Sequence, residues 1–209
     1  MDHIEDRHRN LVAIFACAIR ACQIRGDIAR VHGANGQIAA ATWLPVTGIP
    51  VEVINMIRSG MIWMPFAVGP SAMVRMQRHE APCERLIRRR LPETSGYLWS
   101  VGVEPSAMGQ GAGREVIAIA CAQMMEGGLT HCVLKTENEA NVTFYEHLNF
   151  RTCETISDPR SNLRSWVMVK PLELEPSVAT RQALGRTHKD KTGNCPAVDN
   201  ASGAEGTIR

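Results

Sequence analysis

The chain has 209 residues, of which 44% are apolar and 21% charged, and its formal net charge is +2. This composition predicts one globular domain with a core, and the near-neutral charge excludes the basic surface typical of nucleic-acid binding. Seven cysteines without a C-x-x-C pair argue against a zinc site. We therefore expect no metal, and reduced, mostly buried thiols in a cytoplasmic protein.

The first expected element is a helix at residues 4–25, closed by Gly26. The apolar run 11–19 inside it is too short to cross a bilayer. Acidic residues precede this run, where a signal peptide has basic ones. An ordinary half-buried helix is thus expected, with no membrane association.

Two strands come next, with the pair Asn35–Gly36 between them, which strongly favours a hairpin. A mostly helical insert at 51–91 follows and is expected to break at Pro65 and Pro70. Residues 173–209 are polar and show no periodicity, which predicts a disordered tail. The other expected elements are strands 28–32, 37–44 and 97–103, helix 113–126, strand 131–136, helix 139–148, and strands near 150–156 and 164–170.

Three glycines, Gly109, Gly111 and Gly113, lie between the expected strand 97–103 and the expected helix 113–126. A helix N-terminus has unpaired N–H groups and partial positive charge, and glycines let an anion approach the backbone closely. The spacing matches neither the dinucleotide fingerprint G-x-G-x-x-G nor a P-loop, which needs a Lys and a Ser or Thr. The loop is therefore predicted to bind a phosphate of another kind.

A second motif follows at the matching distance along the chain. It runs from Thr136 through Asn141, Phe144 and Tyr145 to Phe150. Together the two motifs resemble the GNAT superfamily of N-acetyltransferases, whose glycine loop holds the pyrophosphate of acetyl-coenzyme A. The similarity is greatest to the puromycin N-acetyltransferase-like branch, because Val-Gly-Val-x-Pro recurs at 101–105 and Trp-x-Met at 166–168.

The resemblance covers residues 28–172 and is strongest over 96–170. It implies an α+β, three-layer fold with a mixed, mostly antiparallel central sheet flanked by helices. We expect this domain over residues 1–172. Members of the family begin with a strand and a helix for which this chain leaves no room before residues 4–25. Either the start is wrongly assigned or the first strand of the sheet is lost, and its loss would leave an exposed strand edge.

The resemblance also implies a site for acetyl-CoA. Strand residues 101–103 would run along the pantetheine arm, and Gly102 is expected either at a bulge or packed under a neighbouring side chain. Tyr145 is the expected catalytic acid; from its spacing with Phe144 alone it reads as a core aromatic residue. The expected coenzyme-binding residues are Val101, Val103, Met108, Gly109, Gln110, Gly111, Ala112, Gly113 and Asn141.

No general base is evident. Lys135 stands where the puromycin-transferase-like branch has a glutamate, and Glu137 is expected at the start of the next helix. Arg85 and Arg88 to Arg90 could meet a coenzyme phosphate, although a solvated helix face is favoured. The histidines show no ligand spacing and are expected at the surface or with satisfied partners.

The function expected from these features is transfer of an acetyl group from acetyl-CoA to a primary amine of a small molecule, by direct transfer. Two alternatives stay open: a degenerate acyl-CoA-binding protein without turnover, and a protein N-acetyltransferase. The partners expected are the amine acceptor and, as an assembly, a homodimer.

Overall fold

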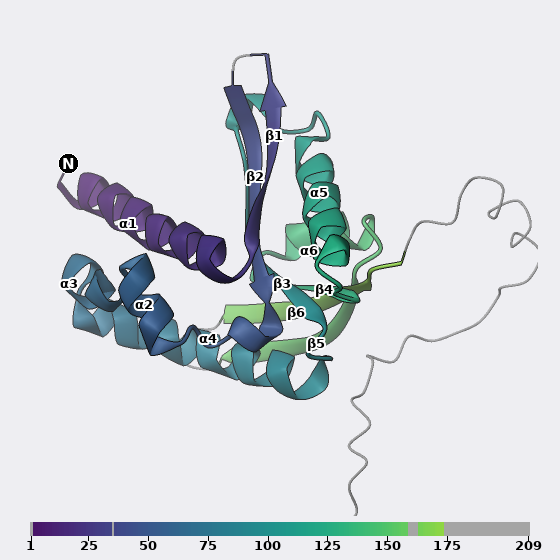
Figure 1. The fold of residues 1–209 in the computed structure, drawn as a ribbon. Coiled ribbons are helices and arrows are strands. Elements are labelled where there is room, and N and C mark those ends of the chain that lie inside the picture. Colours follow the sequence, from purple (N-terminus) through teal and green to yellow (C-terminus); the bar gives the residue numbers. More distant parts are fainter. Residues whose placement is uncertain (1, 35, 159–162, 174–209) are drawn as a thin grey trace, which may run out of the picture.

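In the computed structural model, residues 2–34, 36–158 and 163–173 are described. The predicted disordered tail lies, from residue 174 on, outside the described residues. Six strands form one sheet in the order β1-β2-β3-β4-β6-β5, in which only β3 and β4 are parallel (Figure 1). The expected mixed, mostly antiparallel sheet flanked by helices is confirmed. The strands are β1 (Asp27–Gly33), β2 (Gly36–Pro45), β3 (Ser95–Val103), β4 (His131–Thr136), β5 (Arg151–Asp158) and β6 (Leu163–Pro171).

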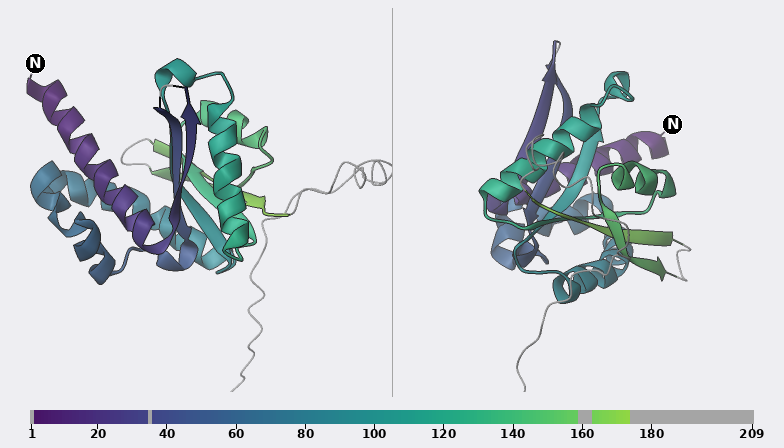
Figure 2. Two further views of the ribbon diagram at one scale, coloured as in Figure 1. Left: turned by 45° about the horizontal axis from the view of Figure 1, so that its top comes forward. Right: turned by 90° about the vertical axis from the view of Figure 1, so that its right-hand side faces the viewer.

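Helices cover both faces of the sheet (Figure 2). Helix α5 lies against β1, β2 and β3, and α6 lies beside β4 and β5 on the same face. On the opposite face, α1 packs against β1 and β2, and α4 packs against β5 and β6. The helices are α1 (Asp2–Arg25), α2 (Val53–Ser59), α3 (Met64–Val68), α4 (Pro70–Arg90), α5 (Ala112–Glu126) and α6 (Glu139–Glu146).

Each face of the sheet has its own hydrophobic core. The alternation of side chains along a strand sends successive residues of β4 to opposite faces. Leu134 therefore joins the core under α5, and Val133 joins the core under α4. The same alternation sends the next residue, Lys135, to the α4 face, where its ammonium meets a carboxylate of that helix.

The breaks in the helical insert differ from the prediction. Pro65 and Pro70 lie in the first turns of α3 and α4, where a missing N–H costs nothing. The chain turns instead at Gly60 and Gly69, whose φ values are +81° and +88°. Glycine adopts this left-handed region without the Cβ penalty of other residues, so the glycines and not the prolines end the preceding elements.

The hairpin of β1 and β2 is confirmed, although Asn35 of its turn is outside the described residues. β1 is an edge strand of the sheet, and no described strand pairs with its outer side. After α6, Asn149 has a φ of +66°, a left-handed conformation that asparagine tolerates better than most residues.

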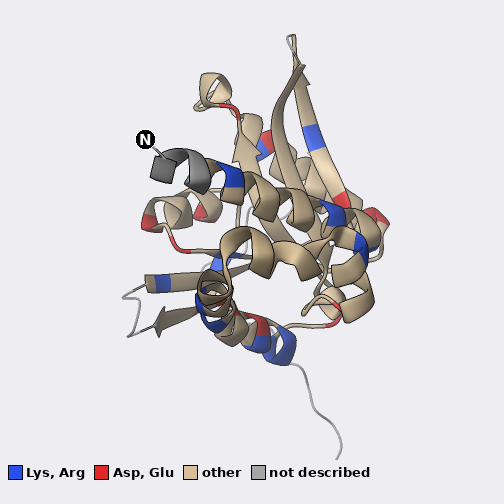
Figure 3. Cartoon of the chain, turned by 90° about the vertical axis from the view of Figure 1, so that its left-hand side faces the viewer, with Lys and Arg blue, Asp and Glu red and all other residues tan. Residues whose placement is uncertain are grey.

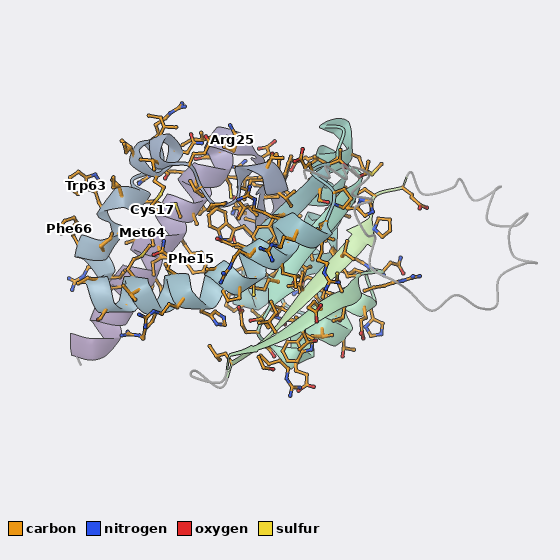
Figure 4. The ribbon with its side chains drawn as sticks, turned by 90° about the horizontal axis from the view of Figure 1, so that it is seen from below. Phe15, Cys17, Arg25, Trp63, Met64 and Phe66 are labelled. Carbon is orange, nitrogen blue, oxygen red and sulfur yellow. The ribbon has the colours of Figure 1, made fainter. Side chains whose placement is uncertain are left out.

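Helices α1, α2 and α3 form a lobe beside the sheet, joined by Cys17 of α1 and Met64 of α3 in its interior (Figure 4). The outer side of this lobe carries few charged residues (Figure 3). Phe15, Trp63 and Phe66 are exposed there.

Five cysteines are free and buried, as expected of reduced thiols: Cys17, Cys22, Cys83, Cys121 and Cys132. Cys153, in contrast, is disulfide-bonded, which the expectation of reduced thiols did not include. Across the described part of the chain, every helix is too short or too polar to cross a bilayer.

Candidate functional site

The two parallel strands part before either one ends. β3 and β4 pair from Ser95 with His131 to Leu98 with Leu134. Beyond that point β3 continues to Val103 and β4 to Thr136 without pairing with each other. We call this opening, between residues 99–103 and 135–136, the strand notch. Its facing backbone groups are available to an extended ligand, because strand pairing no longer uses them.

A bulge lies where the notch begins. On β2, Trp43 pairs with Leu98 and the next residue, Thr42, pairs with Ser100, so Trp99 is the extra residue on β3. A bulge bends its strand and changes the direction of the following side chains. The bend thus lies next to the point where β3 leaves β4.

Both expectations for Gly102 are wrong. It pairs regularly with Ala40, so the bulge lies three residues earlier. A Cβ added at Gly102 would also meet no atom within 4 Å, so it is not packed under a neighbour. The absent side chain leaves open space beside the notch.

The glycine loop connects β3 to α5 as predicted. Gly109 and Gly111 have φ values of +76° and +88°, the left-handed region that favours glycine. Internal hydrogen bonds use the N–H groups of Met108 and Gln110, which donate to the carbonyls of Pro105 and Ala107. The backbone N–H groups of Met108 and Gln110, two of the expected coenzyme-binding residues, are therefore not free to bind an anion. The N–H groups that donate to no described residue are those of Gly109, Gly111, Ala112, Gly113 and Arg114.

Beside this loop is a cavity of about 550 Å³, a size typical of small-molecule sites. We call it the glycine-loop cavity. It lies on the α5 face of the sheet and extends from the loop to the β3 side of the notch. Its lining residues are Val101, Val103, Ala107, Met108, Gly109, Gly111, Gly113, Arg114, Phe144, His147 and Leu148.

The cavity brings together most of the predicted coenzyme-binding residues and adds others. Arg114 places a cation at the start of α5, and its position directly after the glycines could have revealed it. His147 lies one residue beyond α6 and carries no sequence signal. Gln110 and Ala112 do not line the cavity: the Gln110 side chain donates to the carbonyl of Ser106, and Ala112 is buried in the core.

Helix α6 carries the two remaining predicted residues, neither of which lines the cavity. Asn138 caps the helix by accepting from the N–H of Ala140. Asn141 donates weakly to Oγ1 of Thr136, at 3.5 Å, which ties α6 to the end of β4. The helix thus follows directly from the edge of the notch.

Tyr145 is a core aromatic residue as well as a candidate acid. Its ring packs against Phe144 and Phe150, with centroids 5.3 and 5.6 Å away. Its hydroxyl has no hydrogen-bond partner among the described residues. The hydroxyl oxygen is also not one of the fully buried polar atoms that lack a partner. Burial raises the pKa of Tyr145 above its ordinary value, so the hydroxyl retains its proton at neutral pH.

On the other face of the notch, Lys135 lies in an ion-pair network. Its Nζ is 2.6 Å from Oε1 of Glu80 on α4 and 2.7 Å from Oε1 of Glu137. Burial works against the charged lysine, but the two carboxylates raise the pKa of Lys135 above its usual value. The expectation that Glu137 lies at the start of the helix is wrong, because Glu137 comes directly before the helix cap, Asn138. The lysine is thus a structural cation and not a base.

The arginines of α4 are not part of the cavity. Arg85, Arg88, Arg89 and Arg90 are exposed, and Arg85 donates to the carbonyl of Ala81 in its own helix. They agree with the favoured reading of a solvated helix face.

Comparison with known proteins gives a family model that matches part of the chain. Residues 71–150, which include α4, β3, the glycine loop, α5, β4 and α6, match the model described as acetyltransferase (GNAT) family. No curated protein matches the sequence.

Among solved structures, a ribosomal-protein-alanine N-acetyltransferase from Brucella melitensis is similar, with 16% identity and a TM-score of 0.43, over 69% of this chain and 68% of that one. An agmatine N-acetyltransferase is similar with 13% identity and a TM-score of 0.49, over 68% of this chain and 75% of that one.

Proposed function

We propose that this chain moves an acetyl group from acetyl-CoA to the primary amine of a small molecule, by direct transfer, and the match of residues 71–150 to the acetyltransferase (GNAT) family model supports this proposal. The observation that carries the proposal is the set of free amide groups at Gly109, Gly111 and the start of α5, beside the cavity and the notch. These donors suit a pyrophosphate, because they combine a glycine backbone with a helix N-terminus.

The remaining parts of the coenzyme have fitting neighbours. Arg114 would meet a phosphate at the start of α5, which adds a charge-assisted contact to the amide donors. The side chains of Val101 and Val103 would lie along the pantetheine arm, and unpaired β3 backbone would bond its amides. The thioester would then reach the notch, which is open to the α4 face at Gly102.

Chemistry at the notch needs a proton for the departing thiolate. Tyr145 is the candidate donor, because burial keeps its hydroxyl protonated and its helix, α6, packs against β4. The charge of Lys135 does not oppose a cationic acceptor, since Glu80 and Glu137 both neutralise it.

The experiment is calorimetric titration of the full chain with acetyl-CoA, followed by thiol release on adding a panel of small primary amines. We expect binding and amine-dependent release. Failure to bind acetyl-CoA would overturn the proposal. Binding without release from any amine would favour the degenerate acyl-CoA-binding protein, and release only with peptides would favour a protein N-acetyltransferase.

A further inference from the structure

His79 of α4 is held by a carboxylate at the end of β4. Its Nε2 lies 3.2 Å from Oε1 of Glu137, which is 58 positions later in the chain. The side chain of His79 is 17% exposed, so it is largely packed but reached by solvent. The contact agrees with the expectation of a histidine with a satisfied partner, but the sequence does not indicate which partner, because the contact joins two segments far apart in sequence.

The contact determines which ring nitrogen carries the proton. An ionised carboxylate only accepts hydrogen bonds, so Nε2 of His79 must donate. Burial acts to raise the pKa of Glu137, but Lys135 and His79 together hold it below the usual range, so the group is ionised at neutral pH. The Nδ1 atom of the neutral ring is then left with a lone pair. An imidazole oriented in this way by a carboxylate is the arrangement of a general base.

The cluster does not need a metal ion to balance its charge. Ligand atoms of His79, Glu80 and Glu137 lie within 4.8 Å of one another. However, Nζ of Lys135 is already within 2.7 Å of both carboxylates, and only 7% of its side chain is exposed. The lysine therefore supplies the cation, and it also holds the Glu137 carboxylate in place for His79.

The pair lies at the edge of the notch. Glu137 directly follows Thr136, the last residue of β4, and β4 has by then lost its pairing with β3. Lys135 and α4 place the pair on the α4 face, whereas the glycine-loop cavity and Tyr145 lie on the α5 face. A coenzyme bound in the cavity and an acceptor approaching from the α4 face would meet at the notch between them.

We infer that His79 takes the proton from the acceptor amine, with Glu137 as the positioning residue that orients its ring. This inference rests on the proposed function. The amine nitrogen forms the C–N bond at the thioester carbonyl and the C–S bond breaks. The attacking amine is neutral, and the one proton that its nitrogen loses goes to Nδ1 of His79 and from there to solvent. The thiolate receives a proton from Tyr145, which solvent restores. Atoms and charge balance without any further reactant.

Other ionisable groups face the pair and bear on its pH dependence. Burial, and then the nearby charge of Glu80, raises the pKa of Glu84, while Lys135 and Arg88 oppose that rise. The groups that face the pair are Glu80, Cys83 and Glu84 of α4, Lys135 of β4 and Tyr97 of β3. The pH profiles of the rate must therefore be compared between wild type and variants in which all of these other groups are unchanged.

The test uses the full chain with His79→Gln, Glu137→Gln and the control His131→Gln. His131 is at the opposite end of β4, where its Nδ1 is 3.0 Å from Thr130 Oγ1. We expect His79→Gln to lower kcat about 10²-fold or more with acetyl-CoA affinity unchanged, and Glu137→Gln to lower it about 10-fold or more. In His79→Gln the rate should continue to rise with pH, because the amine must lose its proton unaided. His131→Gln should behave as wild type.

Nitrogen NMR of the imidazole rings tests the pair independently of the acceptor. His79, assigned by its loss in His79→Gln, should carry its proton on Nε2, and Glu137→Gln should change this signal. A proton on Nδ1 instead, or an unchanged kcat in His79→Gln, would overturn the inference. No turnover by wild type with any amine would overturn the proposed function and the base role together, whereas turnover that survives His79→Gln would overturn the base role alone.

Discussion

Nζ of Lys135 donates to Oε1 of Glu80 at 2.6 Å and thereby joins β4 to a helix 55 positions earlier in the chain. The lysine side chain is nearly buried, whereas both of its carboxylate partners are about one-third exposed. We therefore expect Lys135→Met and Glu80→Gln to couple by about 1–2 kcal/mol in a double-mutant cycle of urea unfolding. Purely additive effects would show that the pair contributes nothing to stability.

The same network predicts a pH window for that contribution. The pKa of Glu137 is lowered in the fold, so its share is present above about 4.5 and is lost as pH falls through the folded value. The pKa of Lys135 is raised, so its share is complete below 10.5 and is lost as pH rises through the folded value. The stability difference between wild type and Lys135→Met should be largest between these limits. A difference that is constant with pH would contradict the assignment.

Gly111 and Gly128 form a matched pair for testing the anion site. Both have positive φ, +88° and +78°, and a Cβ at either would meet nothing within 4 Å. Gly111→Glu and Gly128→Glu should therefore cost a similar 1–2 kcal/mol, roughly the penalty for a left-handed residue with a Cβ. Only Gly111→Glu should abolish acetyl-CoA binding in calorimetry, because it places a carboxylate among the free amides. Equal affinities would remove the loop from the binding site.

Tyr145→Phe separates the two roles of this residue. The ring contacts with Phe144 and Phe150 remain, so the free energy of unfolding should change by no more than about 0.5 kcal/mol. Loss of the hydroxyl should slow thiol release about 10²-fold while acetyl-CoA affinity stays the same. The comparison is made by stopped-flow thiol detection beside calorimetry, and an unaltered rate would leave Tyr145 as a core residue only.

Met64 and Phe66 test the helical lobe, since they lie two residues apart in α3 (Figure 4). Met64 is 2% exposed and Phe66 is 82% exposed. Met64→Ala should cost about 2–4 kcal/mol, because it leaves a cavity between α1 and α3. Phe66→Ala should change stability by about 0.5 kcal/mol or less. Thermal unfolding of both variants checks this contrast, which would vanish if the lobe were not packed on α1.

Patterns within a few residues were enough for most of the elements and for the glycine loop that we propose to bind the coenzyme. The glycine loop with Gly109 and Gly111 and the apolar run of β3 both appear in the structure as predicted. Each depends on local backbone geometry, such as a positive φ or a free helix N-terminus, which nearby residues dictate. The prediction that the helical insert breaks at its prolines was wrong, because proline is also common in the first turn of a helix.

The proposed acceptor side depends on the packing of distant segments. Nothing near His79 in the chain indicates a partner, and Lys135 reads locally as a charge reversal. Only the passage of α4 over the end of β4 brings His79, Glu80, Lys135 and Glu137 together. Ion pairs between segments more than 50 positions apart follow from the topology of the fold. A buried charge needs a nearby opposite charge, and only the tertiary structure decides which residue provides it.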